Sequence, residues 1–316
     1  MTPAKEDAAT VLSRQTIQAF DDLNGVHPGF RPAHAKGILL AGVFRPSPGG
    51  SSLTRAPHLH RESTPVTVRF SDFAGVPAVP DNHPDASPRG IAIRFHLAEH
   101  VHTDILGHSV DGFPARTAEE FVEFLHAVYA SAGATSHPTP IEAFLGSHPA
   151  ALEFVQAPKP FPTSFARESF FAVNAYQFTN AGGAIRYGRY RIRPVEGGEY
   201  LDDASAAGKA PDYLMDEVRD RLKKGAMKFQ IVVQLSAAGD VVDDSTVHWP
   251  EDREQVAFGT LELTGEVPND EAEQRHIIFD PIPRVDGIGS SGDPLNEPRA
   301  NAYLMSGRRR RAGGPQ

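Results

Sequence analysis

The sequence predicts an α+β fold in which a closed antiparallel β-barrel carries helices in its connections and at its ends. Strand-like patterns gather in two blocks, at residues 31–109 and 170–263, and helical patterns fill the gap between the blocks and flank them. A parallel sheet would instead need strands and helices in regular alternation. With 316 residues, 40% of them hydrophobic, the chain is long enough to bury a substantial core.

The first half begins with a helix, expected over residues 4–23, where apolar side chains recur at helical spacing until Gly25. Residues 64–70 and 91–97 alternate apolar and other side chains, which indicates strands with one buried face. The stretch between these strands is rich in Pro, Asp and Asn and predicts a long irregular loop. After residue 117 the pattern becomes helical, and a second short helix is expected over 138–155.

The second half repeats the mixture of strands and helices. Strands are expected at 170–178, 185–194, 228–235 and 256–263, with a helix at 213–224 and a last helix at 295–306. The apolar residues 277–279 indicate that the aperiodic segment before the last helix packs over the barrel. We expect a single domain over 1–316, with an N-terminal arm (1–30), the barrel with helical insertions (31–265) and a wrapping segment with the last helix (266–316).

Composition excludes several classes of site and partner. The chain has no cysteine, which excludes disulfides, thiolate metal sites, iron–sulfur clusters and a cysteine nucleophile. A net charge of −9 gives no general attraction to nucleic acid or anionic membranes. No apolar run is long enough to span a membrane and no leader pattern is visible, so a cytoplasmic location is expected. The clustered histidines at 58 and 60, and at 96, 100 and 102, are expected to be solvated, because no third-ligand motif accompanies them.

Four short segments are informative only when their order and spacing in the chain are considered together. They are RPAHAKG (31–37), VRFSD (68–72), SPRGIAIRF (87–95) and GIGSSGDPLNEPRANAY (287–303), supported by VNAYQFTNA (173–181) and YGRYRIRP (187–194). Over residues 25 to 310 the chain resembles the heme catalase superfamily, in particular its small catalase-related peroxidase branch. The resemblance implies an eight-stranded barrel and a ferric heme b cofactor.

Peroxide cleavage at iron needs a group that moves a proton from one oxygen to the other, and histidine does this well near neutral pH. The resemblance implies that His34 is this distal catalytic residue and that Ser71 supports it by hydrogen bonding. Ala33, beside His34, is small enough to let a flat macrocycle approach.

Iron also needs a proximal ligand, and without cysteine the choices are His, Met or Tyr. The resemblance implies Tyr303 as the metal ligand. Arg299 lies four residues earlier, one helical turn away, where a guanidinium would stabilise a phenolate. A plain surface contact is the alternative for such a pair.

Heme carboxylates are anions that must be neutralised when buried. By resemblance, Arg31, Arg69 and Arg310 bind them. Arg310 is one of four arginines at 308–311, and Gly307 is expected to weaken the helix before it, so a solvated basic tail is the alternative.

Two phenylalanines, Phe70 and Phe113, are expected to face the heme, with ordinary core packing as the alternative. Catalases carry a distal asparagine in the segment that matches residues 106–114, and this chain has none there. Ser109 is expected to occupy that position, with His108 and Asp111 within two residues of it. The lost amide and the short C-terminal region favour peroxidase over catalase activity.

The resemblance therefore implies an oxidoreductase that reduces hydrogen peroxide or an organic hydroperoxide with a small organic electron donor and has weak catalase activity, and it leaves a homodimer open. A hydroperoxide-rearranging enzyme of the allene oxide synthase type would share fold and ligands. A non-catalytic heme carrier or sensor is a further alternative, although it would not need the His34–Ser71 pair. The last alternative is a lipocalin-like barrel without heme.

Overall fold

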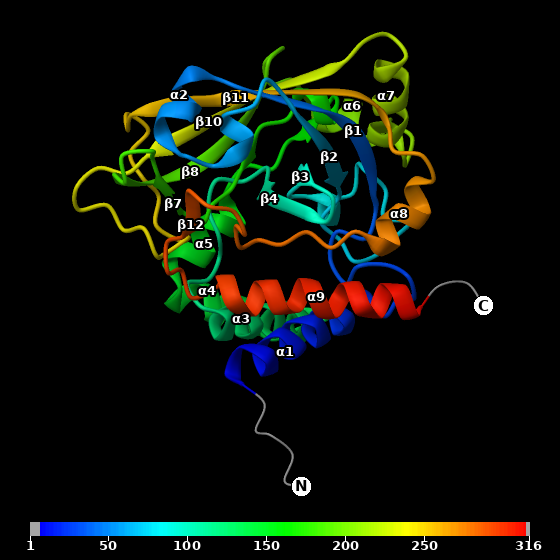
Figure 1. Ribbon diagram of the computed structural model, residues 1–316. Coiled ribbons are helices and arrows are strands. Elements are labelled where there is room, and N and C mark those ends of the chain that lie inside the picture. Colours follow the sequence, from blue (N-terminus) through cyan, green and yellow to red (C-terminus); the bar gives the residue numbers. More distant parts are fainter. Residues whose placement is uncertain (1–6, 314–316) are drawn as a thin grey trace, which may run out of the picture.

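The computed structural model describes residues 7–313 and contains the predicted barrel (Figure 1). Within these residues, eight antiparallel strands form a closed ring in the order β10-β11-β1-β2-β3-β4-β6-β8, and β8 pairs back to β10. The expected α+β fold with an eight-stranded barrel is confirmed. The ring strands are β1 (Gly37–Pro46), β2 (Thr64–Ser71), β3 (Gly90–Ala98), β4 (Val101–His108), β6 (Phe170–Phe171), β8 (Ile185–Pro194), β10 (Met227–Leu235) and β11 (Gln255–Glu266). Two further strands, β7 (Tyr176–Thr179) and β12 (Ile288–Ser290), extend the sheet from β8, and β5 (Phe161–Pro162) pairs with β9 (Tyr200–Leu201).

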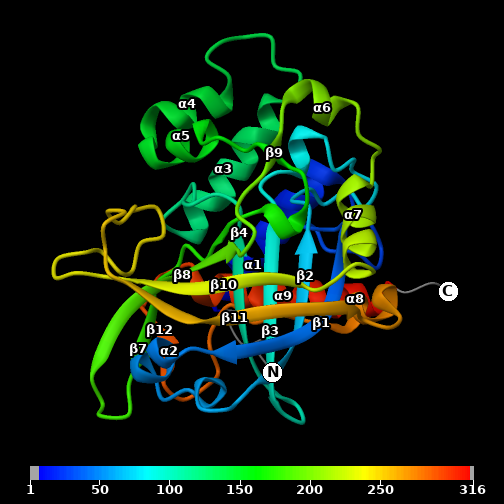
Figure 2. The same cartoon turned by 90° about the horizontal axis from the view of Figure 1, so that it is seen from above.

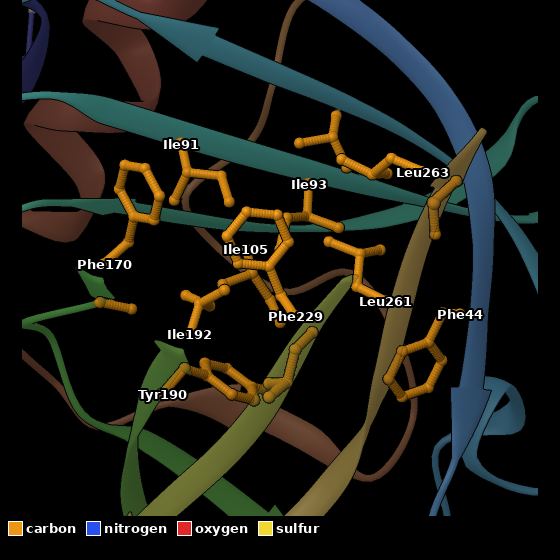
Figure 3. Close-up of a cluster of buried hydrophobic side chains, with 14 of the residues drawn as sticks. Phe44, Ile91, Ile93, Ile105, Phe170, Tyr190, Ile192, Phe229, Leu261 and Leu263 are labelled. Atoms are coloured by element: carbon orange, nitrogen blue, oxygen red, sulfur yellow. The ribbon is translucent and has the colours of Figure 1, made fainter. Parts of the chain in front are cut away.

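The inside of the barrel is filled with apolar side chains (Figure 3). Ile93, Phe229 and Leu261 come from three different strands and are completely buried. Burying one such side chain contributes about 1.5–3 kcal/mol, so the filled interior is the main source of the barrel's stability. The interior is therefore a packed core, and a cofactor must lie outside it.

Three helices cover one side of the barrel: α1 (Ala8–Asn24), α3 (Ala118–Ser131) and α9 (Asn296–Ala312) (Figure 1). α1 packs against both α9 and α3, and α4 (Pro140–Ser147) and α5 (Pro149–Gln156) continue from α3 at one end of the barrel (Figure 2). The other helices are α2 (Pro48–Leu53), α6 (Asp203–Ala207), α7 (Tyr213–Leu222) and α8 (Asp270–His276), with 3-10 turns at Pro57–Leu59, Pro84–Ala86 and Phe165–Arg167. None of the helices in residues 7–313 has the length and hydropathy to cross a membrane.

Three expected elements differ from the structure. The strand expected at 170–178 is divided into β6 and β7, and the helix expected at 138–155 is interrupted at His148, the residue before Pro149, where proline disfavours helical geometry. The last helix does not stop near Gly307 but continues to Ala312. Gly307 is buried, and a methyl group there would lie 2.3 Å from the Ile278 side chain. This glycine therefore permits close packing and does not end the helix.

Candidate functional site

The outer face of strands β1–β4 brings the sequence motifs together. Gly37, Ser71, Gly90 and His108 are direct neighbours across these four strands, and side chains of directly paired residues share a face. The next outward-facing row consists of Leu39, Arg69, Ala92 and Leu106. The residues between the rows point into the barrel core.

Segment 277–279 and helix α9 cover this outer face. Phe279 packs with Leu39 and Leu106, and Tyr303 of α9 packs against the same small cluster. The sequence motifs from both ends of the chain thus meet outside the barrel wall.

The loop before β1 holds His34 over the first of these rows. Its backbone has φ of 56°, an uncommon value for a residue other than glycine that is often found at functional sites. The amide of His34 donates to the Phe73 carbonyl at 2.7 Å, and its ring stands perpendicular to the Phe73 ring at 5.3 Å between centroids. Backbone and ring contacts together fix the orientation of the imidazole.

Ser71 and Gly90 complete the surroundings of this imidazole. Nδ1 of His34 lies 3.1 Å from the Ser71 hydroxyl. A methyl group on Gly90 would lie 2.8 Å from Nδ1 of His34 and 2.6 Å from the Ser71 hydroxyl. The ring therefore occupies space that only glycine leaves free.

The His34 imidazole is neutral at physiological pH. Burial, followed by the positive charge of Arg69, lowers the pKa of His34 to about 3. A neutral ring that donates its Nδ1 proton to Ser71 presents an unprotonated Nε2. The contact with the Ser71 hydroxyl engages Nδ1, and a hydrogen bond between the ring and the Asp72 backbone acts to raise the pKa of His34.

Three arginines from distant parts of the chain gather beside His34. Arg69 donates to the carbonyl of His34 at 2.9 Å. Arg31 and Arg310 both donate to the Ile277 carbonyl, at 3.3 and 2.7 Å. The three arginines thus lie close together; the role expected of them, binding the heme carboxylates, stays a prediction.

The negative charge near this arginine cluster, chiefly that of Asp270, does not outweigh the effects that lower the pKa of Arg31 and Arg69. Within residues 7–313 none of the three forms an ion pair, and Nε of Arg310 is buried without a partner. Burial, and then the charges of Arg69 and Arg310, lower the pKa of Arg31 well below its usual value. Burial is also the main cause that lowers the pKa of Arg69 to about 9 and that of Arg310 to about 10. These arginines donate hydrogen bonds to neutral oxygens, but buried cations without an ion pair are costly, so the cluster favours a bound anion.

Arg299 and Tyr303 lie one turn apart on α9, as expected. The Arg299 guanidinium carbon is 5.7 Å from the centre of the Tyr303 ring. Burial acts to lower the pKa of Arg299, but Tyr303, Tyr176 and Asp293 together act to raise it, and the net shift is upward. Arg299 therefore stays charged beside the phenol.

Two residues that the motifs did not single out hold Arg299. Its Nη1 donates to the Asn174 side-chain oxygen at 2.8 Å, and the Asn174 amide donates to Asp293 at 2.8 Å. Asn174 lies in the gap between β6 and β7, where the expected strand is divided. Both residues lie within motifs that carry the family resemblance, but their pairing depends on the tertiary fold.

Some predicted residues lie elsewhere. Phe70 is fully buried inside the barrel and stacks on Phe165 at 5.1 Å, so the structure does not bring it to the outer face. Ala33 packs against the cluster of α1 and α3 side chains near Phe73. Phe113 lies 5.0 Å from the ring of Phe121 and does join the His108 side of the site.

Ser109 and Asp111 are engaged with other parts of the chain. The Ser109 hydroxyl accepts a hydrogen bond from the Arg89 amide at 2.9 Å, and Asp111 pairs with Arg191 at 2.9 Å. His108 is among the charged or titratable groups that lower the pKa of His34. A role of Ser109 opposite peroxide stays a prediction.

The donor set fits a planar group with two carboxylates, such as heme. The arginine cluster supplies positive charge without ion pairs. Gly90 and Ala92, one in each outward-facing row of β3, have little or no side chain, and the phenol of Tyr303 is a hard oxygen ligand. No group of three or more His, Asp or Glu side chains in residues 7–313 could hold a metal ion by itself.

The chain is similar to known proteins over most of its length. The family described as Catalase matches residues 11–315. The chain is 33% identical to the catalase-related peroxidase of Mycolicibacterium paratuberculosis, covering 92% of both chains, and 30% identical to that of Synechococcus elongatus, covering 97% of this chain and 91% of the other. Among solved structures, a bacterial catalase superimposes with a TM-score of 0.77 at 24% identity, covering 98% of this chain and 62% of the catalase. A fungal catalase gives a TM-score of 0.78 at 22% identity, covering 89% and 59%.

Proposed function

Since the chain belongs to the catalase family, we propose that it is a single-domain, heme-dependent peroxidase with weak catalase activity. It reduces hydrogen peroxide or an organic hydroperoxide with electrons from a small organic donor. The observation that carries this proposal is the meeting of the His34–Ser71 pair, the arginine cluster and the Arg299–Tyr303 pair on one outer face of the barrel.

The cofactor we propose is heme b with Tyr303 as the axial ligand of the ferric iron. The absence of cysteine excludes the thioether attachment of c-type heme. Arg31, Arg69 and Arg310 bind its carboxylates, and Arg299 stabilises the phenolate. When bound, heme supplies the redox-active iron at which the peroxide O–O bond breaks.

His34 and Ser71 carry the proton transfer. Nε2 of His34 accepts the proton of one peroxide oxygen and delivers it to the other, which leaves as water or as an alcohol. A pKa of about 3 favours release of the proton from the imidazolium and disfavours its uptake, so the imidazolium is a transient carrier. Ser71 keeps the ring in the required tautomer and orientation. The donor supplies the two electrons and solvent the two protons that complete the reduction to water, or to alcohol and water.

The donor approaches by a surface cleft of about 180 Å³ beside the arginine cluster. Phe30, Arg31, Pro77 and Arg275 are among its lining residues, and Arg31 also belongs to the cluster. Glu271 also lines the cleft and pairs with Arg275, so the mixture of apolar and charged groups suits a small aromatic donor. We separately expect the protein to form a homodimer, which light scattering would detect.

Tyr303→Phe tests the proposal directly. The purified wild-type protein should show the visible spectrum of ferric heme, and the variant should lose most of its heme because phenylalanine has no ligand atom. Tyr129→Phe, an exposed position on α3, is the matched control and should keep the wild-type spectrum. A heme-free wild type, or a Tyr303→Phe spectrum equal to that of wild type, would contradict the proposal.

A further inference from the structure

The imidazole of His108 faces the same glycine as His34. His108 ends β4 directly opposite Gly90, and Gly90 in turn lies opposite Ser71. Because Gly90 has no side chain, the His34 ring fits between the Ser71 and His108 positions. The pKa of His34 responds to His108, which agrees with this proximity.

Contacts on two sides hold the His108 ring. Its Nδ1 accepts a long hydrogen bond from the Val110 amide at 3.4 Å. The ring also packs edge-on against Phe154 at 6.2 Å and lies 6.5 Å from Phe113. A neutral imidazole that accepts at Nδ1 carries its proton on Nε2, so His108 offers an N–H donor on the side away from Val110.

His108 offers this donor without a charge. Burial, followed by the charge of Arg299, lowers the pKa of His108 to about 3, with the Val110 backbone acting in the opposite direction. The two rings are therefore complementary: His34 has an acceptor at Nε2, and His108 has a donor at Nε2.

We propose that His108 is a second distal binding group, whose Nε2–H donates a hydrogen bond to the peroxide oxygen that His34 does not deprotonate. The inference rests on the proposed peroxidase function. It assigns to His108 the contact with peroxide that the sequence analysis expected of Ser109. A hydroperoxide R–O–O–H offers one proton to donate and lone pairs to accept, which matches the pair of imidazoles. The hydrogen bond holds the leaving oxygen where the proton from His34 can reach it.

The first test measures the tautomer without using activity. The ¹⁵N chemical shifts of His108 in histidine-labelled protein, assigned by comparison with His108→Phe, should report a protonated Nε2 and an unprotonated Nδ1. A protonated Nδ1 would overturn the proposal, because Nε2 would then be an acceptor.

The second test uses cyanide as a probe of the distal side of the ferric protein, together with the stopped-flow reaction with hydrogen peroxide. His108→Phe should raise the Kd for cyanide about tenfold and slow the peroxide reaction about tenfold, the scale of one lost hydrogen bond in a dry site. His108→Asn restores a donor and should remain within about threefold of wild type. His126→Phe, at an exposed position on α3, is the control for histidine removal.

The outcomes separate the two proposals. A wild-type protein without heme or peroxidase activity would remove the proposed function, whereas the tautomer could still be measured. An active wild type with His108→Phe unchanged and Ser109→Ala impaired would overturn the assignment to His108 and return it to Ser109. Equal losses in His108→Phe and His108→Asn would also overturn it, because a donor at this position would then have no effect.

Discussion

The inner and outer faces of strands β1–β4 use the same backbone for opposite purposes. On the inner face, Phe70 and Ile91 are buried among other apolar side chains. On the outer face, the residues next to them in sequence are Arg69, Ser71 and Gly90. Arg69 is a cation without an ion pair, and Gly90, which has no side chain, leaves room for the imidazole that contacts Ser71. Because strand side chains alternate between faces, one strand can contribute apolar side chains to a stable core and polar side chains to a ligand-binding surface.

The comparison predicts the largest effect for the inner face. Phe70→Ala should lower the free energy of unfolding by about 3–5 kcal/mol, because it leaves a cavity in the packed barrel. Thr67→Ala, on the outer face of the same strand, should cost less than about 1 kcal/mol. Urea unfolding measures both. A Phe70→Ala protein with unchanged stability but an altered heme spectrum would support the heme contact expected from the sequence.

On the outer face, His34→Ala should affect the reaction far more than the stability. We expect the reaction with hydrogen peroxide to slow by at least about 100-fold, the usual scale for loss of a general acid–base, while heme binding is kept. Alanine in left-handed backbone geometry costs only about 1–2 kcal/mol. Ser71→Ala should slow the reaction about tenfold. A stopped-flow rate for His34→Ala within threefold of wild type would remove His34 from its proposed role.

Arg310→Met would sharpen the contrast by separating binding from folding. The Kd for heme should rise about tenfold, because one charge-assisted hydrogen bond is lost. The heme-free protein should unfold with unchanged or higher free energy, because a buried cation without an ion pair is removed. Titration with hemin and urea unfolding provide the two measurements. Arg308→Met, at an exposed neighbouring position, should change neither.

The smallest expected effect is a change in the pH dependence of stability, caused by Asp72, the residue directly after β2. Burial raises the pKa of Asp72 to about 7, in spite of the ion pair with Arg89. The folded state therefore binds the proton more tightly than the unfolded state, so stability should fall as pH rises from about 4 to about 7 and then level off. Asp72→Asn should flatten this dependence. Thermal melts at pH 5 and pH 8 test it, and an equal difference in both proteins would contradict the assignment.

The sequence predicted much of the fold because strand alternation is a local property. The strands expected at 64–70 and 91–97 correspond to β2 and β3, and the strands at 185–194 and 228–235 correspond to β8 and β10. The division of β6 from β7 was not predictable from the local pattern, and Asn174 in this gap contacts Asp293, 119 residues away. Helix α8 was missed because its charged sequence shows no apolar stripe.

The candidate site, like the fold, could be predicted from the sequence only in part. The motifs identified His34, Ser71 and Tyr303, and the structure places them at the same outer face. The choice between Ser109 and His108 depends on register, because a shift of one residue in β4 exchanges the two faces. The choice among the four arginines depends on the packing of α9: Arg309 pairs with Asp21, Arg311 bonds the His276 carbonyl, and only Arg310 turns toward the cluster.

Helix α1 lies on the far side of α9 from the barrel (Figure 1) and is fastened to it at both ends. The Ser13 hydroxyl donates to the Pro298 carbonyl at 2.7 Å, and Asp21 pairs with Arg309. A group enclosed between the barrel wall and α9 can leave only when α9 moves, and α9 can move only when these contacts with α1 break. The residence time of the cofactor is then governed by the local opening of α1 and α9. A cofactor of modest affinity is therefore retained for long periods. Its binding is easiest before the two ends of the chain have docked.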